Sequence, residues 1–410
     1  MGKTKDLRPL LLLEAATLIS GTGNGISLVA LPWLVLELTG RATAAGIVAT
    51  AMALPLVASS VFSGTMVDLL GRRATSMASD AASALAVAAI PALALTGGLT
   101  VPVVAALAAL GAVFDPAGVT ARESMLPDAA LRAGLRLGRA NGVHEAIWGV
   151  AFLVGPGVGG LLIATVGATA TLWATAAGFV AAIALIAAAR VPASGRPDAA
   201  ERPKGLLRGT ADGLRFVWND RLLRALALVA CAIVALYLPI EGVLLPAWFQ
   251  QQGAPGQLGA VLMALSVGGI VGALAYGQWG GHVGRRALYL TAIVGTGAAT
   301  IAMATLPPVP LLIAAAAACG LAYGPVQPLI NLAVQTRTPP WLRGRVIGVL
   351  VAAEYSAGPV GYLLAGPAVD AFGVRPAFFG LAVALLMVAL GTTLLPSLRL
   401  LGDLPDAPPD

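Results

Sequence analysis

Long apolar runs separated by short polar segments make up most of this chain. Crossing the hydrocarbon layer of a bilayer, about 30 Å thick, takes about 20 apolar residues in a helix. Only helices and closed barrels satisfy their backbone in lipid, and barrel strands would alternate and be much shorter. The pattern therefore predicts an all-α membrane protein with twelve transmembrane helices. We place them at residues 9–38, 42–67, 73–95, 101–120, 141–165, 168–189, 222–248, 258–279, 286–306, 309–332, 346–369 and 375–395.

The two halves of the chain repeat one another. Residues 64–73 (GTMVDLLGRR) and 277–286 (GQWGGHVGRR) each lie between two apolar runs, about half the chain apart. Phe114-Asp-Pro in the fourth predicted helix also matches Tyr323-Gly-Pro in the tenth. Internal duplication of this kind is typical of membrane transporters and predicts two related bundles of helices.

The repeat divides the chain into three predicted parts. Residues 1–190 and 222–410 form two pseudo-symmetric six-helix bundles, the second with a short cytoplasmic tail. Residues 191–221 form a cytoplasmic central loop, and the apolar residues in its second part have the spacing of an amphipathic helix on the inner membrane face. The other connections are too short to hold a soluble catalytic domain.

The positive charges predict the orientation. With the amino terminus inside, all of the 25 Lys and Arg residues except Arg41 and Arg375 fall in cytoplasmic segments. We therefore expect both termini in the cytoplasm, at a bacterial-type inner (plasma) membrane. The formal net charge of +6 comes from residues scattered along membrane flanks, where they meet the headgroups of membrane lipids. That distribution argues against a nucleic-acid partner.

Carboxylates inside the predicted helices are the strongest chemical signal. The sequence places no Lys or Arg deep in a predicted helix to pair with them, and Arg122 falls just outside one. A carboxylate removed from water holds a proton more tightly, so such groups can take up and release protons as a cavity opens. His144 and His282 are expected near the cytoplasmic surface. The candidate carboxylates are Glu14, Asp80, Asp115, Glu145, Glu241 and Glu354.

Several segments resemble the major facilitator superfamily, and more narrowly its macrolide-efflux and enterobactin-exporter branch of drug:proton antiporters. They are residues 38–46 (LTGRATAAG), Phe114-Asp-Pro-Ala with residues 122–127 (RESMLP), and Ala140-Asn-Gly leading into Gly155-Pro. The resemblance covers nearly the whole chain. It implies two six-helix bundles that rock around a central cavity lined by helices one, four, seven and ten.

This resemblance ranks the carboxylates. Asp115, Glu241 and Glu14 fall on cavity-lining helices, and Glu241 lies between two prolines that interrupt regular helix geometry. Each of the three is alternatively interpreted as a carboxylate that is satisfied by a partner or lies at the level of the headgroups, above all Glu14, which lies near the membrane surface. The other three lie on helices that more often pack or gate, namely Asp80, Glu145 and Glu354.

Residues 64–73 resemble the superfamily's loop between helices two and three. In the superfamily its carboxylate, here Asp68, meets the positive amino end of helix eleven when the cytoplasmic side is closed. The second copy has Gly281 at the carboxylate position, so a matching latch in the other bundle is not expected. The two arginines of the first copy are alternatively interpreted as topology anchors. The predicted latch comprises Gly64, Asp68, Gly71, Arg72, Arg73, Arg343 and Arg345.

The fifth predicted helix resembles a glycine and proline motif that the superfamily associates with exporters. Ala151 replaces one of its glycines. Bare helix faces allow close helix contacts and the proline bends the helix, so the motif indicates outward transport; ordinary packing of small residues is the alternative. Its matching residues are Gly142, Gly155, Pro156, Gly159 and Gly160.

The sequence thus predicts a proton-coupled exporter of small amphipathic or hydrophobic compounds such as drugs or natural products. Its expected partners are a small-molecule substrate, protons and membrane lipids, and one chain would form a complete pathway as a monomer. Cys231 and Cys319 lack a second thiol or a histidine at ligand spacing, so we expect no disulfide, metal or cofactor.

Three alternatives stay open. An importer or proton symporter on the same fold would differ only in direction and coupling. An intramembrane lipid- or prenyl-transferring enzyme would need clustered metal-binding carboxylates or a nucleophile with a base, and the sequence offers neither. A membrane protein that kept the fold without transport is the third. The sequence does not identify the substrate.

Overall fold

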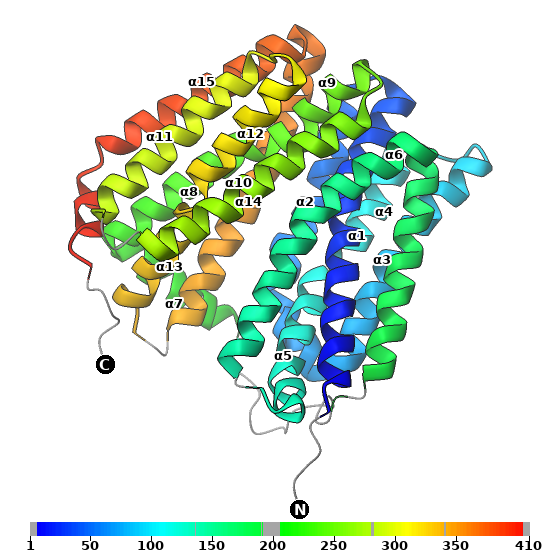
Figure 1. Ribbon diagram of the computed structural model, residues 1–410, viewed down its shortest axis with the longest axis horizontal. Coiled ribbons are helices and arrows are strands. Elements are labelled where there is room, and N and C mark those ends of the chain that lie inside the picture. Colours follow the sequence, from blue (N-terminus) through cyan, green and yellow to red (C-terminus); the bar gives the residue numbers. More distant parts are fainter. Residues whose placement is uncertain are drawn as a thin grey trace, which may run out of the picture. The chain divides into compact units, whose positions relative to one another are not determined.

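A computed structural model describes residues 6–135, 137–189, 191, 206–279, 283–339 and 342–404, and every regular element in them is helical (Figure 1). The elements of the first half are α1 (Arg8–Thr39), α2 (Ala42–Leu70), α3 (Arg72–Leu95), α4 (Val101–Val113), α5 (Asp115–Ala133) and α6 (Leu137–Ala189). Those of the second half are α7 (Leu206–Asn219), α8 (Arg221–Pro239), η2 (Ile240–Leu244), α9 (Leu245–Gln251), α10 (Pro255–Trp279), α11 (Arg285–Ala304), α12 (Val309–Tyr323), α13 (Val326–Arg337), α14 (Arg343–Phe372), α15 (Val374–Thr393) and η4 (Pro396–Leu401).

Ten helical stretches in the described residues are long and apolar enough to cross a membrane. One of them, Ala146–Ala189, contains a left-handed glycine, Gly167 (φ 81°, ψ 163°), which divides α6 into two arms. α2 adds a shorter apolar stretch, Ala42–Val57. The prediction of an all-α membrane protein is confirmed, and these elements are compatible with the twelve predicted crossings.

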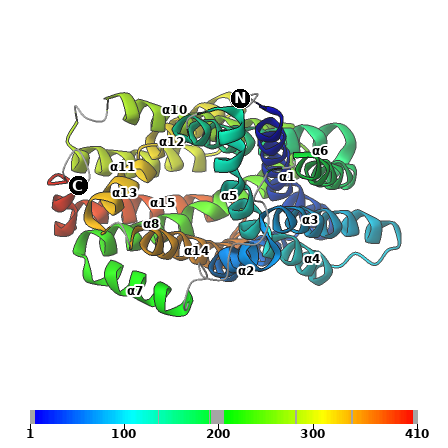
Figure 2. The ribbon, with the colours of Figure 1, turned by 90° about the horizontal axis from the view of Figure 1, so that it is seen from below.

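The chain forms two compact units. Unit 1 comprises Met1–Thr39 and Ala51–Lys204, and unit 2 comprises Gly40–Thr50 and Gly205–Asp410. These bounds differ from the predicted bundles in two respects, and the first is that the start of α2 packs with the second half of the chain. α7 also belongs to unit 2, where it lies beside α8 and α14 (Figure 2).

Glycines bring the helices of unit 1 close together. α1 packs against both arms of α6, with Gly25 facing Gly155 on the first arm and Gly23 facing Phe179 on the second. A Cβ added at Gly25 would lie 2.9 Å from the Cα of Gly155, so a larger side chain would force the helices apart. Small residues of this kind are a common basis of helix packing in membranes.

The fourth and tenth predicted helices are each broken at the same point of the repeat. α4 passes into α5 at Phe114, and α12 passes into α13 at Gly324 and Pro325. A proline follows each break and removes one backbone donor. The match between the Phe114 and Tyr323 segments is therefore confirmed as a structural repeat. Both predicted helices ended too early, because the helical stretches run on to Ala133 and Arg337.

Candidate functional site

A buried ion pair joins three helices of unit 1. The Arg122 guanidinium on α5 donates to both carboxylate oxygens of Asp80 on α3, at 3.2 and 3.0 Å. It also donates to the Ser20 hydroxyl on α1 at 3.1 Å, and that hydroxyl donates to Asp80 at 2.7 Å. Arg122 and Asp80 are 2% and 1% exposed. The prediction that no cation lies deep beside the carboxylates is therefore wrong, because α5 continues the fourth crossing past residue 120 and carries Arg122 inward.

A second buried pair joins α1 to the first arm of α6. Nδ1 of His144 lies 3.1 and 3.0 Å from the two carboxylate oxygens of Glu14. His144 is 3% exposed and Glu14 is 4% exposed. His144 lies within α6 with its ring packed inside the bundle, rather than in a loop or at a helix end as expected, and its depth in the membrane stays a prediction. The pairing agrees with the alternative interpretation of Glu14 as a carboxylate satisfied by a partner.

Asp115 differs from both pairs. It opens α5 directly after the break in the fourth crossing and is half-buried. Its carboxylate accepts a hydrogen bond from the Ser83 hydroxyl at 3.2 Å, and no Lys, Arg or His of the described residues lies within salt-bridge distance of it. Arg122 acts on Asp115 electrostatically but donates its hydrogen bonds to Asp80. Two carboxylates thus share the field of one guanidinium.

The carboxylate of Glu241 in unit 2 lies in a break of the seventh crossing. The π-helical turn Ile240–Leu244 carries it between α8 and α9, as expected from the two flanking prolines. Turns of this kind occur frequently at functional sites. Tyr237 lies one turn before Glu241 in the sequence, and its ring stacks on Tyr323 with centroids 6.1 Å apart and planes 6° apart.

Tyrosines gather around this part of unit 2. All six tyrosines of the chain lie in its second half. The Tyr362 ring packs against Gly242 in the π-helical turn, where an added Cβ would lie 2.8 Å from a ring carbon. Glu354 on α14 is half-buried and makes no hydrogen bond or ion pair with another described residue. Among the described residues neither Glu241 nor Glu354 forms an ion pair, in contrast to Asp80 and Glu14.

Comparison with known proteins places the chain in a family. The model of the family described as transmembrane secretion effector matches residues 10–401. The chain belongs to this family. It is an integral membrane transporter of the major facilitator superfamily and not an enzyme, which confirms the resemblance seen in the sequence.

The relatives that the chain matches are pumps. The chain is 48% identical over 394 residues to the multidrug efflux pump Tap of Mycolicibacterium fortuitum, covering 95% of this chain and 96% of that protein. It is 48% identical over 402 residues to Tap of Mycobacterium tuberculosis (strain ATCC 25618 / H37Rv), covering 97% and 96%.

Solved structures share the fold at low identity. The nucleoside transporter NupG superposes with a TM-score of 0.75 at 14% identity, covering 94% of this chain and 98% of that one. A bacterial homologue of the lysosomal transporter Spinster superposes with a TM-score of 0.72 at 14% identity and 98% coverage of both chains. At such identities the likeness concerns the fold alone.

The arginines of the predicted family latch have other partners. Arg72 pairs with Asp128 on α5 at 3.1 Å, and Arg73 donates to the Ala187 carbonyl. Arg345 lies 3.5 Å from Asp212 on α7, and both side chains are exposed. The surroundings of Gly64 and the side chains of Asp68 and Arg343 lie outside the described residues, so the latch stays a prediction. Gly71 links α2 to α3 with a left-handed φ of 88°.

The glycine and proline motif packs α6 against α1. Gly155 faces Gly25, a Cβ at Gly159 would lie 3.2 Å from the Cα of Ile26, and Pro156 and Gly160 are buried beside them. These contacts favour the packing interpretation of the motif. Gly142 and the Glu145 side chain lie outside the described residues.

A further carboxylate, that of Asp370, caps the first turn of α2. Asp370 near the end of α14 accepts hydrogen bonds from the backbone amides of Ala42 and Thr43, at 2.7 and 2.9 Å. Those amides begin α2 and have no partner within their own helix. The same two helices touch at Gly46, where an added Cβ would lie 2.6 Å from the Tyr362 carbonyl oxygen.

Proposed function

We propose that this transporter is a proton-coupled exporter of small lipophilic compounds and that Asp115 carries the coupled proton. The direction is supported by the family description of secretion and by the two relatives named as multidrug efflux pumps. The observation that carries the proton assignment is the contrast between Asp115 and the other carboxylates of unit 1. Asp80 and Glu14 are buried and paired, whereas Asp115 is half-buried and bonded to one hydroxyl.

Charge balance explains why Asp115 would take the proton. With both acids ionised, Asp80, Asp115 and Arg122 carry a net charge of −1 in apolar surroundings, which is costly. One proton makes the group neutral. Asp80 accepts bonds from the guanidinium and from Ser20, which stabilise its charged form, so the proton goes to Asp115. Its location at the break between α4 and α5 leaves it partly accessible.

The substrate side of the proposal concerns unit 2. Glu241 offers a negative charge next to the stacked rings of Tyr237 and Tyr323. A carboxylate beside aromatic faces is suited to a lipophilic cation, which gains from both the charge and the ring quadrupoles. We therefore expect amphipathic cations to be better substrates than anions.

Transport in everted membrane vesicles tests the proposal. A lipophilic cationic dye should accumulate inside when the lumen is acidified, and Asp115→Asn should remove that accumulation while keeping exchange of dye across the membrane without a pH gradient. Asp128→Asn, which alters the half-exposed ion pair between Asp128 on the same helix and Arg72, is the matched control. Accumulation that occurs only in right-side-out vesicles would make the protein an importer. Equal accumulation by Asp115→Asn would move the proton to another group.

The remaining expectations belong to the same proposal. Both termini lie in the cytoplasm, the protein works as a monomer, and Asp68 latches helix two to the start of α14. Reporter fusions at the two ends test the orientation. Light scattering of the purified protein in detergent tests the monomer.

A further inference from the structure

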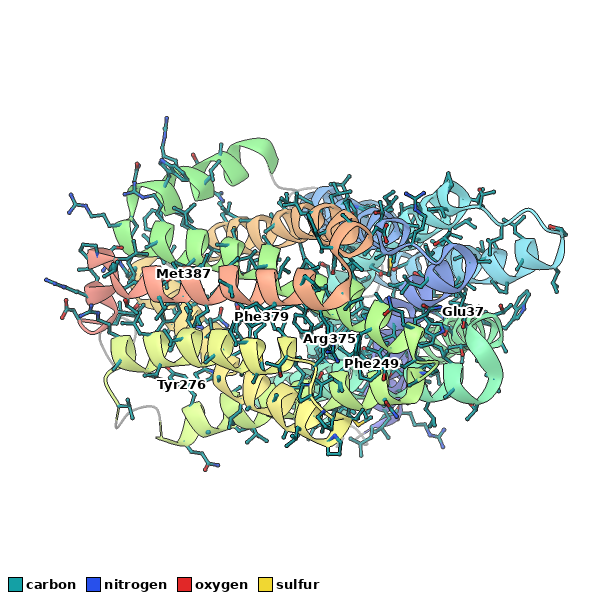
Figure 3. The ribbon with its side chains drawn as sticks, turned by 90° about the horizontal axis from the view of Figure 1, so that it is seen from above. Glu37, Phe249, Tyr276, Arg375, Phe379 and Met387 are labelled. Atoms are coloured by element: carbon teal, nitrogen blue, oxygen red, sulfur yellow. The ribbon has the colours of Figure 1, made fainter. Side chains whose placement is uncertain are left out.

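A groove of about 680 Å³ runs between α8 and α15 in unit 2. Ala225, Leu228 and Ala232 line it from α8, and Val388 and Leu395 line it from the other side. Leu228 is 54% exposed, so the groove opens to the outside of the unit. Figure 3 looks onto α15, whose outer face also carries the exposed side chains of Phe379 and Met387. The long sides of the groove are therefore apolar and face the membrane.

One end of the groove is strongly basic. Arg221 and Arg224 line it at the start of α8. Among the described residues no carboxylate lies within 4.0 Å of either guanidinium. The neighbouring Asp220 does not compensate them, because it pairs with Arg337 at 2.8 Å and also accepts from two amides of the first turn of α8. Two positive charges are thus left at the mouth of an apolar groove.

The position of Arg224 is fixed by α7. Its guanidinium donates to the Trp218 carbonyl at 2.9 Å and lies 5.9 Å from the centre of the Trp218 ring. The ring is 56% exposed, in the position expected of an aromatic side chain at the membrane interface. These contacts use one face of the guanidinium and leave further N–H donors for a ligand.

We infer that this groove binds an acidic phospholipid, with its phosphate on Arg221 and Arg224 and an acyl chain along Leu228 and Ala232. The spacing supports this, because residues 224, 228 and 232 follow one another at four-residue intervals on one face of α8, leading from charge to apolar surface. Arginine binds phosphate through paired hydrogen bonds, and basic pockets between membrane helices bind anionic headgroups. The site lies on the cytoplasmic leaflet if the predicted orientation holds. The inference does not depend on the transported substrate or on proton coupling.

Native mass spectrometry of the purified transporter tests this site. The protein is mixed with phosphatidylglycerol or with phosphatidylcholine of the same acyl chains. The wild type should retain one phosphatidylglycerol in preference to phosphatidylcholine. Each arginine near an anionic headgroup contributes about a fivefold gain in binding, so Arg221→Gln with Arg224→Gln should reduce retention about 25-fold. Arg215→Gln, an exposed arginine on α7 that does not line the groove, should retain the lipid as the wild type does.

A second variant separates a lipid from a simple anion. Ala232→Phe fills the apolar part and leaves both arginines in place, so it should lower retention of phosphatidylglycerol. Millimolar sodium phosphate should not displace the lipid. Arg221→Lys keeps the charge and should keep most of the binding, whereas Arg221→Gln alone should lower it about fivefold, and this comparison tests the charge if the double glutamine variant does not fold.

Several outcomes would overturn the inference. Equal retention of the two lipids would mean a non-selective annular contact. Unchanged binding in the Arg221→Gln and Arg224→Gln variant would remove the arginines from the site. Displacement by phosphate together with unchanged binding in Ala232→Phe would indicate an anion site without an acyl chain.

Discussion

The two units hold carboxylates among apolar helices in different ways. Unit 1 surrounds Asp80 with a guanidinium and a hydroxyl and pairs Glu14 with His144. Unit 2 places Glu241 beside tyrosines. A buried ion pair fixes both partners and holds helices together, because losing either partner leaves an uncompensated charge. A carboxylate that forms no ion pair among the described residues, such as Glu241 or Asp115 of unit 1, keeps its charge available for a proton or a cationic ligand. The difference separates structural acids from acids that can take part in transport.

The largest effect is expected from breaking the ion pair of unit 1. Arg122→Gln leaves Asp80 charged and buried, which costs about 3–5 kcal/mol of stability. Thermal unfolding of the detergent-purified protein measures the loss. Arg72→Gln, which opens the half-exposed pair with Asp128, should cost at most about 1 kcal/mol. Replacing Arg122 and Asp80 together by leucine should recover most of the loss. A similar midpoint for Arg122→Gln and the wild type would mean that the pair does not hold unit 1 together.

The apolar pattern predicted the helices well because their ends coincide with polar or glycine residues. The first predicted helix, 9–38, is found as Arg8–Thr39, and the twelfth, 375–395, as Val374–Thr393. Hydropathy reports whether a segment is long and apolar, and it needs no knowledge of neighbouring helices.

The pairing of the carboxylates could not be predicted in the same way. Arg122 begins a polar segment just beyond the predicted end of the fourth helix, yet its guanidinium contacts Asp80, 42 residues earlier. Such contacts depend on which helix faces meet, and a single sequence does not report this. One signal was present: Ser76, Ser79 and Ser83 surround Asp80 on one face of α3, and a polar stripe inside an apolar helix requires partners.

The next effect sharpens the contrast inside unit 1. With two pH units across the membrane, one-for-one exchange of a proton for a monovalent cation moves no net charge and supports at most about a hundredfold accumulation of the dye. Asp115→Asn should abolish the accumulation of dye. It should also lower the unfolding temperature less than Arg122→Gln does. Dye accumulation in everted vesicles and thermal unfolding are measured on the same preparation. If Asp115→Asn loses stability as severely as Arg122→Gln, then Asp115 belongs to the structural acids.

A smaller effect is expected from unit 2. Glu241→Gln should raise the KM for a cationic dye about tenfold and leave that for a neutral compound nearly unchanged, because a charge interaction of about 1.4 kcal/mol is lost. Tyr237→Phe removes only the hydroxyl and should raise the KM less. Proton-driven accumulation at saturating dye should persist in both. Loss of accumulation at every dye concentration would instead assign proton coupling to unit 2.

The smallest effect is expected at α2, the helix that begins in unit 2 and ends in unit 1. Asp370→Ala leaves the amides of Ala42 and Thr43 without their acceptor, and the loss of such a cap costs about 1 kcal/mol. Because Asp370 is exposed, water replaces part of the lost bond. Hydrogen exchange of the peptide that covers the first turn of α2 should therefore speed up by at most about fivefold, while α3 is unchanged. Asp370→Asn keeps one acceptor oxygen, so its exchange rate should lie between those of the wild type and Asp370→Ala. Exchange that is equally fast in all three proteins would mean that α2 starts without help from α14, and unit 2 would then begin after the central loop.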